Sequence, residues 1–380
     1  MKYASVCSGV EAASLAWMPL GWEAVWFSEI EPFPCAVLKE RFPNVPNLGD
    51  MTKIKVENLQ NGDQKYYGED GANVIIPGGV DLLVGGTPCQ AFSVSGNRQG
   101  IEDPRSALCL KYTELLGEIH PRWFVWENVP GVFSTNEGKD FKEFLRKVNE
   151  IGYSCAWRVL DAQYTRVDGF PFAIPQRRRR VFLVGHSSGD WRFPAAVLFE
   201  QEVCDGNTPP SRVKKRGNSR NFEERSESPV GTLSIGNGQL HTLQTPYYEL
   251  AQTLDCMHDA PAILCYENHQ QDNRLKEMNE CCCTLNAHMG TGGNNVPIVQ
   301  HVEDLVNFKP LFMRRFTPIE CERLMGFPDN YTQISWRGKP VEKCPNNRRY
   351  KACGNSMCVN VMRWLGMRID KVDKGLIELP

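Results

Sequence analysis

The sequence predicts an α/β protein with a mostly parallel sheet covered by helices on both faces, together with a smaller, loop-rich β domain. Short apolar segments alternate with segments of helical periodicity through residues 1–185, and beyond them Gly, Asn, Ser, Pro and Thr become frequent. We therefore expect a large domain at 1–185, a small domain at 186–345, and a C-terminal segment at 346–380 that returns to the large domain.

The individual elements follow from the hydrophobic pattern. Short, continuously apolar segments are typical of parallel strands that are buried on both faces. Apolar residues at helical spacing predict helices at 10–17, 107–119 and 139–151. Thr317 with Glu320 three residues later is a capping-box pattern for a helix at 318–325, and a last helix is expected at 356–369. The expected strands are 3–6, 24–27, 81–84, 123–126 and 180–184.

Composition and charge exclude some classes of protein. The chain has 380 residues, of which 41% are hydrophobic and 23% charged, with a net charge of −2. No apolar run is long enough for a membrane helix and no signal-peptide pattern precedes the first strand, so we expect a cytoplasmic protein without a membrane attachment. The cysteines are expected to be reduced, and we predict no metal site because paired Cys-x-x-Cys knuckles are missing.

The first turn is the candidate cofactor site. In open α/β sheets, ligands bind where a strand ends and a helix begins, and here that turn is Cys7-Ser8-Gly9-Val10-Glu11. Glu29 follows the second predicted strand, where a carboxylate can accept both ribose hydroxyls, and Asp50 is placed to meet an adenine edge. Each acid alone is more simply a surface residue, but their order along the chain favours a nucleotide-like cofactor.

Two further strands are followed by reactive side chains. Cys89 lies in Pro88-Cys89-Gln90 after two glycines, where a thiolate can act as a nucleophile; the alternative is a buried structural cysteine. Glu127 and Asn128 follow the fourth predicted strand, where the carboxyl group can act as an acid or simply cap the strand.

A run of basic residues precedes the last predicted strand of the large domain. Gln176, Arg178 and Arg180 alternate and therefore share one face. They are placed to meet an anionic ligand or to approach Cys89, and a salt-bridged edge strand is the alternative. Other basic clusters lie at 214–216, 314–315 and 348–351, so the near-neutral chain still has patches that can contact a phosphate backbone.

Taken together, these motifs resemble those of the cytosine-C5 DNA methyltransferases, in particular the phage and prophage branch. The resemblance covers nearly the whole chain except the loop-rich insert at about 187–310. The family's Pro-Cys-Gln, Glu-Asn-Val, Gln-x-Arg-x-Arg, Arg-x-x-Thr-Pro and Gly-Asn-Ser motifs stand at 88–90, 127–129, 176–180, 314–318 and 354–356. The first motif departs from the family: its usual Phe-x-Gly-x-Gly is Cys7-Ser8-Gly9-Val10-Glu11 here.

The resemblance implies a Rossmann-like fold of the S-adenosylmethionine-dependent methyltransferases, with the small domain acting in target recognition. It implies methyl transfer from S-adenosyl-L-methionine to C5 of a cytosine flipped out of double-stranded DNA, through a covalent bond between Cys89 and C6. The implied catalytic residues are Cys89, Glu127, Arg178 and Arg180. Those implied for the cofactor are Ser8, Gly9, Val10, Glu29, Ile30, Asp50, Pro88, Asn355 and Ser356. Those implied for the substrate are Gln90, Asn128, Gln176 and Arg315.

Two alternatives to this function stay open. An RNA cytosine-C5 methyltransferase is disfavoured by the long insert, and a catalytically silent DNA-binding relative is disfavoured by the intact Pro-Cys-Gln and Glu-Asn-Val motifs. We expect a monomer that associates with the nucleoid when it is bound to DNA. The sequence does not distinguish an orphan enzyme from the partner of a cognate restriction endonuclease.

Overall fold

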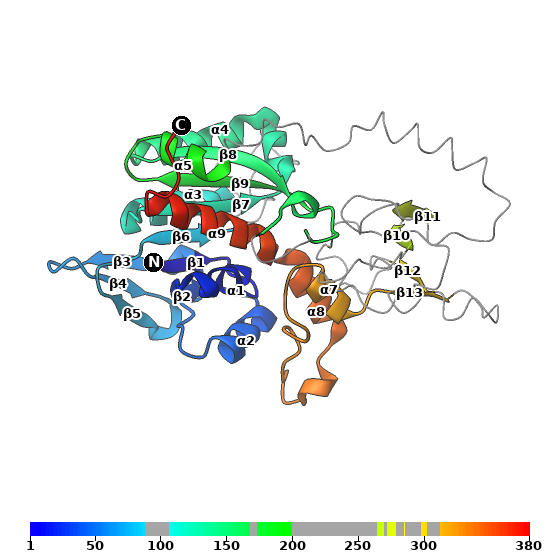
Figure 1. The fold of residues 1–380 in the computed structure, drawn as a ribbon. Helices are drawn as coiled ribbons and strands as arrows, with labels where there is room; N and C mark the ends of the chain where they lie inside the picture. Colours follow the sequence, from blue (N-terminus) through cyan, green and yellow to red (C-terminus); the bar gives the residue numbers. More distant parts are fainter. Residues whose placement is uncertain are drawn as a thin grey trace.

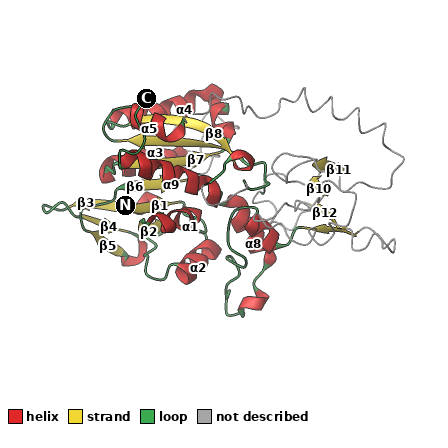
Figure 2. Cartoon of the chain, viewed as in Figure 1, coloured by secondary structure: helices red, strands yellow, loops and turns green. Residues whose placement is uncertain are grey.

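A central six-stranded sheet organises the molecule (Figures 1 and 2). The computed structural model describes residues 1–87, 106–167, 173–199, 264–269, 272–278, 285, 298–301 and 312–380. The strand order is β2-β1-β6-β7-β9-β8. Neighbours from β2 to β7 are parallel, and β9 is antiparallel to both β7 and β8, so the predicted mostly parallel sheet is confirmed. The strands are β1 (Lys2–Val6), β2 (Glu23–Ser28), β6 (Leu82–Gly85), β7 (Trp123–Asn128), β8 (Ser154–Asp161) and β9 (Arg179–His186).

Alternate residues of the central strands enter two cores, one on each face of the sheet. In β7, Val125 packs into one core and Trp126 into the other, and in β6 Val84 and Leu83 divide in the same way. Because both faces are covered, these strands are apolar up to their carboxyl ends. The first core receives α1 (Ala12–Trp17), α2 (Pro32–Arg41), α5 (Arg192–Leu198) and α9 (Val359–Asp373). The second receives α3 (Ser106–Ile119), α4 (Lys139–Glu150) and the small sheet of β3 (Lys55–Asn58), β4 (Gln64–Tyr67) and β5 (Asn73–Ile76).

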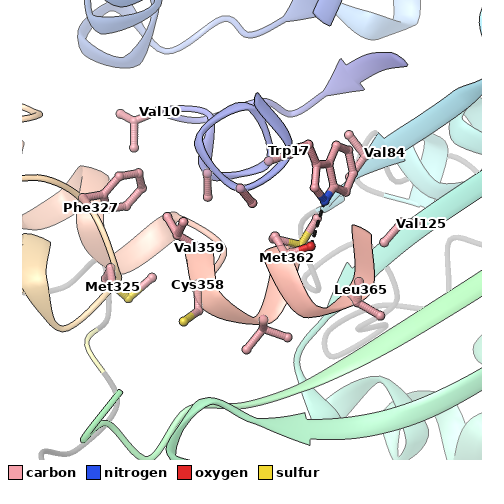
Figure 3. Close-up of a cluster of buried hydrophobic side chains, with 14 of the residues drawn as sticks. Val10, Trp17, Val84, Val125, Met325, Phe327, Cys358, Val359, Met362 and Leu365 are labelled. Carbon is pink, nitrogen blue, oxygen red and sulfur yellow. Dashed lines mark hydrogen bonds between the residues drawn. The ribbon is translucent and has the colours of Figure 1, made fainter. Parts of the chain in front are cut away.

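The C-terminal segment closes the first core. Trp17 of α1 is fully buried, and its indole Nε1–H donates to the carbonyl of Met362 in α9 at 2.7 Å (Figure 3). These two residues are 345 positions apart. The first strand–turn–helix unit is therefore completed only when the end of the chain has packed against it.

The segment before α9 carries a predicted cap and a buried ion pair. In α7 (Pro318–Arg323), Thr317 and Glu320 form the predicted capping box. Behind it, Glu322 pairs with Arg349 of α8 (Asn346–Asn355) at 3.0 Å, and both side chains are buried. The main chain of Thr332 also donates to Glu322, at 2.9 Å. This pair fixes the direction of α8, whose last turn leads into the loop before α9.

Several elements differ from the prediction. Helix α1 begins at Ala12 because Glu11 has a left-handed conformation and caps it, and α9 begins at Val359 because Ser356 ends α8. Helix α5 falls where we expected no helix, and Arg368 of α9 donates to its Ala196 and Val197 carbonyls. Elements that were not predicted at all are α2, α8, β3, β4, β5 and β8.

The described part of the insert is β-structured. It forms an antiparallel sheet in the order β11-β10-β12-β13. The strands are β10 (Leu264–His269), β11 (Asp272–Met278), β12 (Ile298–His301) and β13 (Phe312–Arg315). Figure 1 shows this sheet separate from the central one, next to α7 and α8. Among the described residues, no helix has both the length and the hydrophobicity to cross a membrane.

Replacing Arg349 with Met should lower the free energy of unfolding by about 3–5 kcal/mol, because Glu322 would remain buried without its cation. Urea denaturation measures this loss. The double variant Glu322→Leu/Arg349→Met should recover most of the stability, since neither charge is then buried alone. If the double variant is no more stable than Arg349→Met, the burial of an unpaired Glu322 charge is not the cause of the loss.

Candidate functional site

A pocket of about 400 Å³, open on one side, lies at the carboxyl ends of β1, β6 and β7. Strand β1 has β2 on one side and β6 on the other, so the order of the strands reverses at β1. Open α/β sheets bind ligands at such a switch point. The loop between α8 and α9 closes the far side. The lining residues are Ser5, Cys7, Ser8, Gly9, Glu11, Ala12, Ala13, Val84, Gly86, Glu127, Asn355, Ser356 and Met357.

The loop after β1 has an unusual backbone. Cys7, Gly9 and Glu11 have φ angles of 51°, 57° and 62°, and a left-handed conformation costs a residue with a side chain about 1–2 kcal/mol. The Ser8 N–H donates to the Ser28 carbonyl at 3.1 Å and so joins the ends of β1 and β2. A Cβ atom at Gly9 would meet open space. The main chain of this loop is therefore accessible to a ligand.

Cys7 lines the pocket but is not a reactive thiol. Burial, aided by the nearby Glu29 carboxylate, raises the pKa of Cys7 to about 12. Its sulfur faces the sulfur of Met51 at 3.6 Å. At neutral pH this cysteine is a neutral wall residue, because only a thiolate attacks efficiently.

Glu29 joins the ends of the first two strands. Its carboxylate accepts the main-chain N–H groups of Gly9 at 2.7 Å, Ile30 at 2.8 Å and Glu31 at 2.7 Å. Burial raises the pKa of Glu29, and these three hydrogen bonds oppose the rise. The carboxylate is thus anchored beside the open backbone of Gly9.

Four of the predicted cofactor residues do not line this pocket: Glu29, described above, and Ile30, Asp50 and Val10. The Ile30 side chain is 65% exposed beside Glu29. The Asp50 carboxylate accepts the N–H of Thr52 at 2.9 Å and caps a short turn. The Val10 side chain is fully buried in the core, while its carbonyl accepts the hydroxyl of Tyr331 at 2.7 Å.

Glu127 places a carboxyl group in the pocket wall at the end of β7. Arg180 Nε lies 3.0 Å from its Oε1, and both side chains are largely buried. Burial raises the pKa of Glu127, and the positive charges of Arg180 and Arg178 oppose this rise. A Cβ at Gly86 would come within 3.3 Å of Glu127 Oε2 and 3.0 Å of Met357 Cε, so a glycine allows this close approach.

Arg178 is engaged by the protein itself. Its Nη1 donates to the Leu285 carbonyl at 2.7 Å, and its Nη2 donates to the carbonyls of Ser356 at 2.6 Å and Gly354 at 3.1 Å. Burial lowers the pKa of Arg178 to about 9, and the charge of Arg180 adds to this effect. The guanidinium therefore holds the pocket loop in position.

The predicted substrate residues that are described have varied surroundings. Gln176 is buried and its Nε2 donates to the Leu324 carbonyl at 3.0 Å. Asn128 is buried and its Nδ2 donates to the Thr87 carbonyl at 3.0 Å, which ties β7 to β6. Arg315 is exposed on β13.

The pocket thus gathers only part of the predicted site. The predicted residues that line it are Ser8, Gly9, Glu127, Asn355 and Ser356. The predictions for Pro88, Cys89 and Gln90 lie outside the described residues. Sequence reasoning missed Glu11 and Met357 as lining residues. The signal for Glu11 was available, because a carboxylate replaces a glycine in the first turn.

A sequence profile described as C-5 cytosine-specific DNA methylase matches residues 1–371. The chain belongs to this family.

Curated relatives of this chain include phage enzymes. The DNA N-6-adenine-methyltransferase of Escherichia phage P1 is 33% identical over 97% of this chain and 61% of its own length. The orphan methyltransferase M.SPRI of Bacillus phage SPR is 34% identical over 49% of this chain and 37% of its own length. The chain therefore spans less than two thirds of either relative. The type II methyltransferase M.Bsp6I of Bacillus sp. (strain RFL6) is 24% identical over 98% of this chain and 99% of its own length.

Solved structures confirm the Rossmann-like methyltransferase fold. The Schizosaccharomyces pombe Dnmt2 methyltransferase superposes with a TM-score of 0.56 at 17% identity, covering 98% of this chain and 99% of its own. A structure from an E. coli prophage, described as a DNA modification methyltransferase, gives 0.54 at 17% identity, with 98% and 99% covered. At these identities the likeness shows the fold alone.

The C-5 methylase family takes S-adenosyl-L-methionine as methyl donor, which confirms the predicted cofactor. The pocket residues fit this cation. Two carboxyl groups, Glu11 and Glu127, line the pocket and are suited to a cationic ligand, and the main chain beside Gly9 is open to a ligand. Ser356 and Asn355 would hold the donor from the other side. The described part of the chain contains no cluster of His, Cys, Asp and Glu that could hold a metal ion.

Replacing Arg178 with Lys should weaken binding of S-adenosyl-L-methionine about tenfold, because a single ammonium cannot reach all three carbonyls and the Gly354–Ser356 loop loses its support. Isothermal titration calorimetry measures the dissociation constant. Arg177→Lys, at the exposed neighbouring position, is the matched control and should leave the affinity unchanged. Equal affinities for the two variants would show that Arg178 does not position the pocket.

Proposed function

We propose that this protein is a DNA cytosine-C5 methyltransferase in which Cys89 is the nucleophile and Glu127 the acid. The observation that supports this best is the position and the raised pKa of Glu127. Its carboxyl group lies in the wall of the donor pocket, with a raised pKa and with Arg180 at 3.0 Å. A carboxyl group that retains its proton can donate it to a ring nitrogen of a bound base.

The reaction requires this acid because C5 of cytosine is a poor nucleophile. In the proposed mechanism the Cys89 thiolate forms a bond to C6, the ring electrons move toward C5, and N3 takes the proton of Glu127. S-adenosyl-L-methionine supplies the methyl group as an electrophile, which C5 takes. Water or another base then removes the C5 proton, the S–C6 bond breaks to release the thiolate, and N3 returns its proton to Glu127.

Of the two predicted catalytic arginines, Arg180 is the better candidate for contacting the base. It lies against Glu127, while the terminal nitrogens of Arg178 donate to main-chain carbonyls. We therefore assign the orientation of the cytosine O2 atom to Arg180. Arg178 acts indirectly, by holding the Gly354–Ser356 loop that lines the donor pocket.

The substrate we propose is double-stranded DNA with the target cytosine flipped out, at a cost of about a few kcal/mol. Exposed Arg177 and Arg179 flank the buried Arg178, and Arg315 is exposed on β13, so basic side chains lie at the surface where a phosphate backbone would pass. The sheet of β10–β13 belongs to the proposed target-recognition domain at 186–345. Helix α5 falls within that range but packs against α9, so the recognition surface begins after it. We propose a monomer, and a partner endonuclease is a separate question.

The methylated nucleoside tests this function directly. Incubation with duplex DNA or with transfer RNA, followed by digestion and mass spectrometry, identifies both the base and the polymer. We expect 5-methylcytosine from DNA, and bisulfite sequencing then gives the target sequence. N6-methyladenine, the product indicated by the name of the phage P1 relative, would overturn the proposal, as would methylation of RNA alone.

Cys89→Ser should reduce methyl transfer by about a thousandfold or more, because a serine hydroxyl is not ionised at neutral pH. Donor affinity should stay within about twofold, and Cys155→Ser on β8 is the control with full activity. A duplex containing 5-fluorocytosine should trap a covalent adduct on the wild-type protein, which peptide mass spectrometry would locate at Cys89. Full activity of Cys89→Ser would exclude the covalent mechanism.

Glu127→Gln should lower kcat about 10²–10⁴-fold, because the amide keeps the shape of the side chain but has no acidic proton. The wild-type rate should fall as the pH rises through the raised pKa of Glu127, since the acid must be protonated to act. The pH–rate profile of the residual activity in Glu127→Gln should lack this decline. A profile that is unchanged by the substitution would assign the acid to another group.

A further inference from the structure

A second buried carboxyl group, Glu11, lines the same pocket as Glu127. Only 1% of Glu11 is exposed, and its Oε2 accepts the main-chain N–H of Ser14 at 3.0 Å and the Ser14 hydroxyl at 2.6 Å. The Ser14 Oγ in turn accepts the Tyr3 hydroxyl at 2.7 Å. A chain of buried hydrogen bonds from β1 through α1 thus fixes the carboxyl group in the pocket wall.

Glu11 has no cation to compensate its charge within the described parts of the chain. None of the Lys, Arg or His side chains there forms an ion pair with it, whereas Glu127 is paired with Arg180. The titratable groups that face Glu11 are Tyr3 of β1 and Tyr331 after α7, and burial raises the pKa of both phenols, so both are neutral. Burial also raises the pKa of Glu11 itself.

Helix capping alone does not explain a glutamate at this position. Glu11 has a φ of 62°, a conformation that glycine adopts without cost. Ser, Asp and Asn are the common capping residues, and they need no long side chain to reach the helix. The chain thus places an uncompensated carboxyl group in a strained turn that borders the pocket of a cationic cofactor.

We propose that the Glu11 carboxylate is the charge partner of a cationic group of the bound methyl donor, either its ammonium or its sulfonium. This inference rests on binding of the donor in the described pocket and not on the methyl-transfer chemistry. A carboxylate next to the ammonium would strengthen binding of the donor and of its thioether product equally, because both carry that ammonium. A partner at the sulfonium would favour the donor, because the product has lost that charge.

Calorimetry with three ligands tests the proposal and separates the two cations. S-adenosylmethionine has both charges, S-adenosylhomocysteine has only the ammonium, and 5′-methylthioadenosine has neither. Glu11→Gln should weaken binding of the donor about tenfold or more and leave methylthioadenosine within about twofold. A parallel loss for S-adenosylhomocysteine assigns the ammonium, and an unchanged affinity for it assigns the sulfonium. No loss for the donor, or an equal loss for all three ligands, would overturn the proposal.

The variant is chosen so that a structural effect can be recognised. Glutamine keeps the oxygen that accepts from Ser14, and Tyr3→Phe is a matched control that disturbs the same hydrogen-bond chain without removing charge. Tyr3→Phe should weaken binding of each of the three ligands by less than about threefold. A tenfold loss of affinity for the donor alone in Tyr3→Phe would assign the effect to packing instead. Methyl transfer to DNA does not enter these measurements, so a failed function and a failed inference are distinguishable.

Proton release gives an independent readout. Because the pKa of Glu11 is raised in the free protein and a bound cation favours the carboxylate, donor binding near that pKa should release a fraction of a proton from Glu11. Titrations in buffers of different ionisation enthalpy measure this release. Glu11→Gln should lose it, and equal release by both proteins would count against the proposal.

Discussion

The guanidinium of Arg178 is the interaction on which the geometry of the site depends. It precedes β9, yet its hydrogen bonds reach Leu285 in the insert, Gly354 in the last turn of α8 and Ser356 at the end of that helix. Burying an arginine is costly, and the carbonyls offset this cost only while all three segments keep their positions. The pocket loop, the insert and the central sheet therefore share one buried cation, which couples the donor pocket to the part of the chain proposed to read DNA.

Three carboxyl groups at the strand ends differ because their partners differ. Burial raises the pKa of each, but Glu29 is held by three main-chain N–H groups, Glu127 by an arginine, and Glu11 by hydroxyl and amide donors without a cation. A carboxylate that accepts several main-chain N–H groups serves as an anchor. A carboxyl group beside an arginine can release its proton to a base, because the cation stabilises the carboxylate that remains. One with no cation is the natural partner for a ligand that brings a charge of its own.

The sequence predicted the buried elements better than the exposed ones. Strands such as β6 and β7 are largely apolar because both faces are covered, whereas the edge strand β8 and the short strands β3 and β4 mix polar and apolar residues and have no such pattern. Helix α2 contains two prolines and α8 is rich in Asn and Arg, so neither shows an apolar stripe. Within the site, the motifs identified Glu127 and Ser356. They could not show that Arg178 and Asn128 bind main-chain carbonyls, because those partners are distant in the sequence.

The first turn differs from the family motif in its residues but keeps the backbone conformation of a glycine-containing turn. The second glycine of the motif is missing, yet Glu11 adopts the left-handed conformation that a glycine would. Ser14 holds its side chain, and the hydroxyl of Tyr331 holds the preceding Val10 carbonyl at 2.7 Å. The backbone of the turn is thus retained while its charge changes. Because tertiary contacts pay the conformational cost, the substitution changes the electrostatics of the pocket and leaves the strand–turn–helix fold intact.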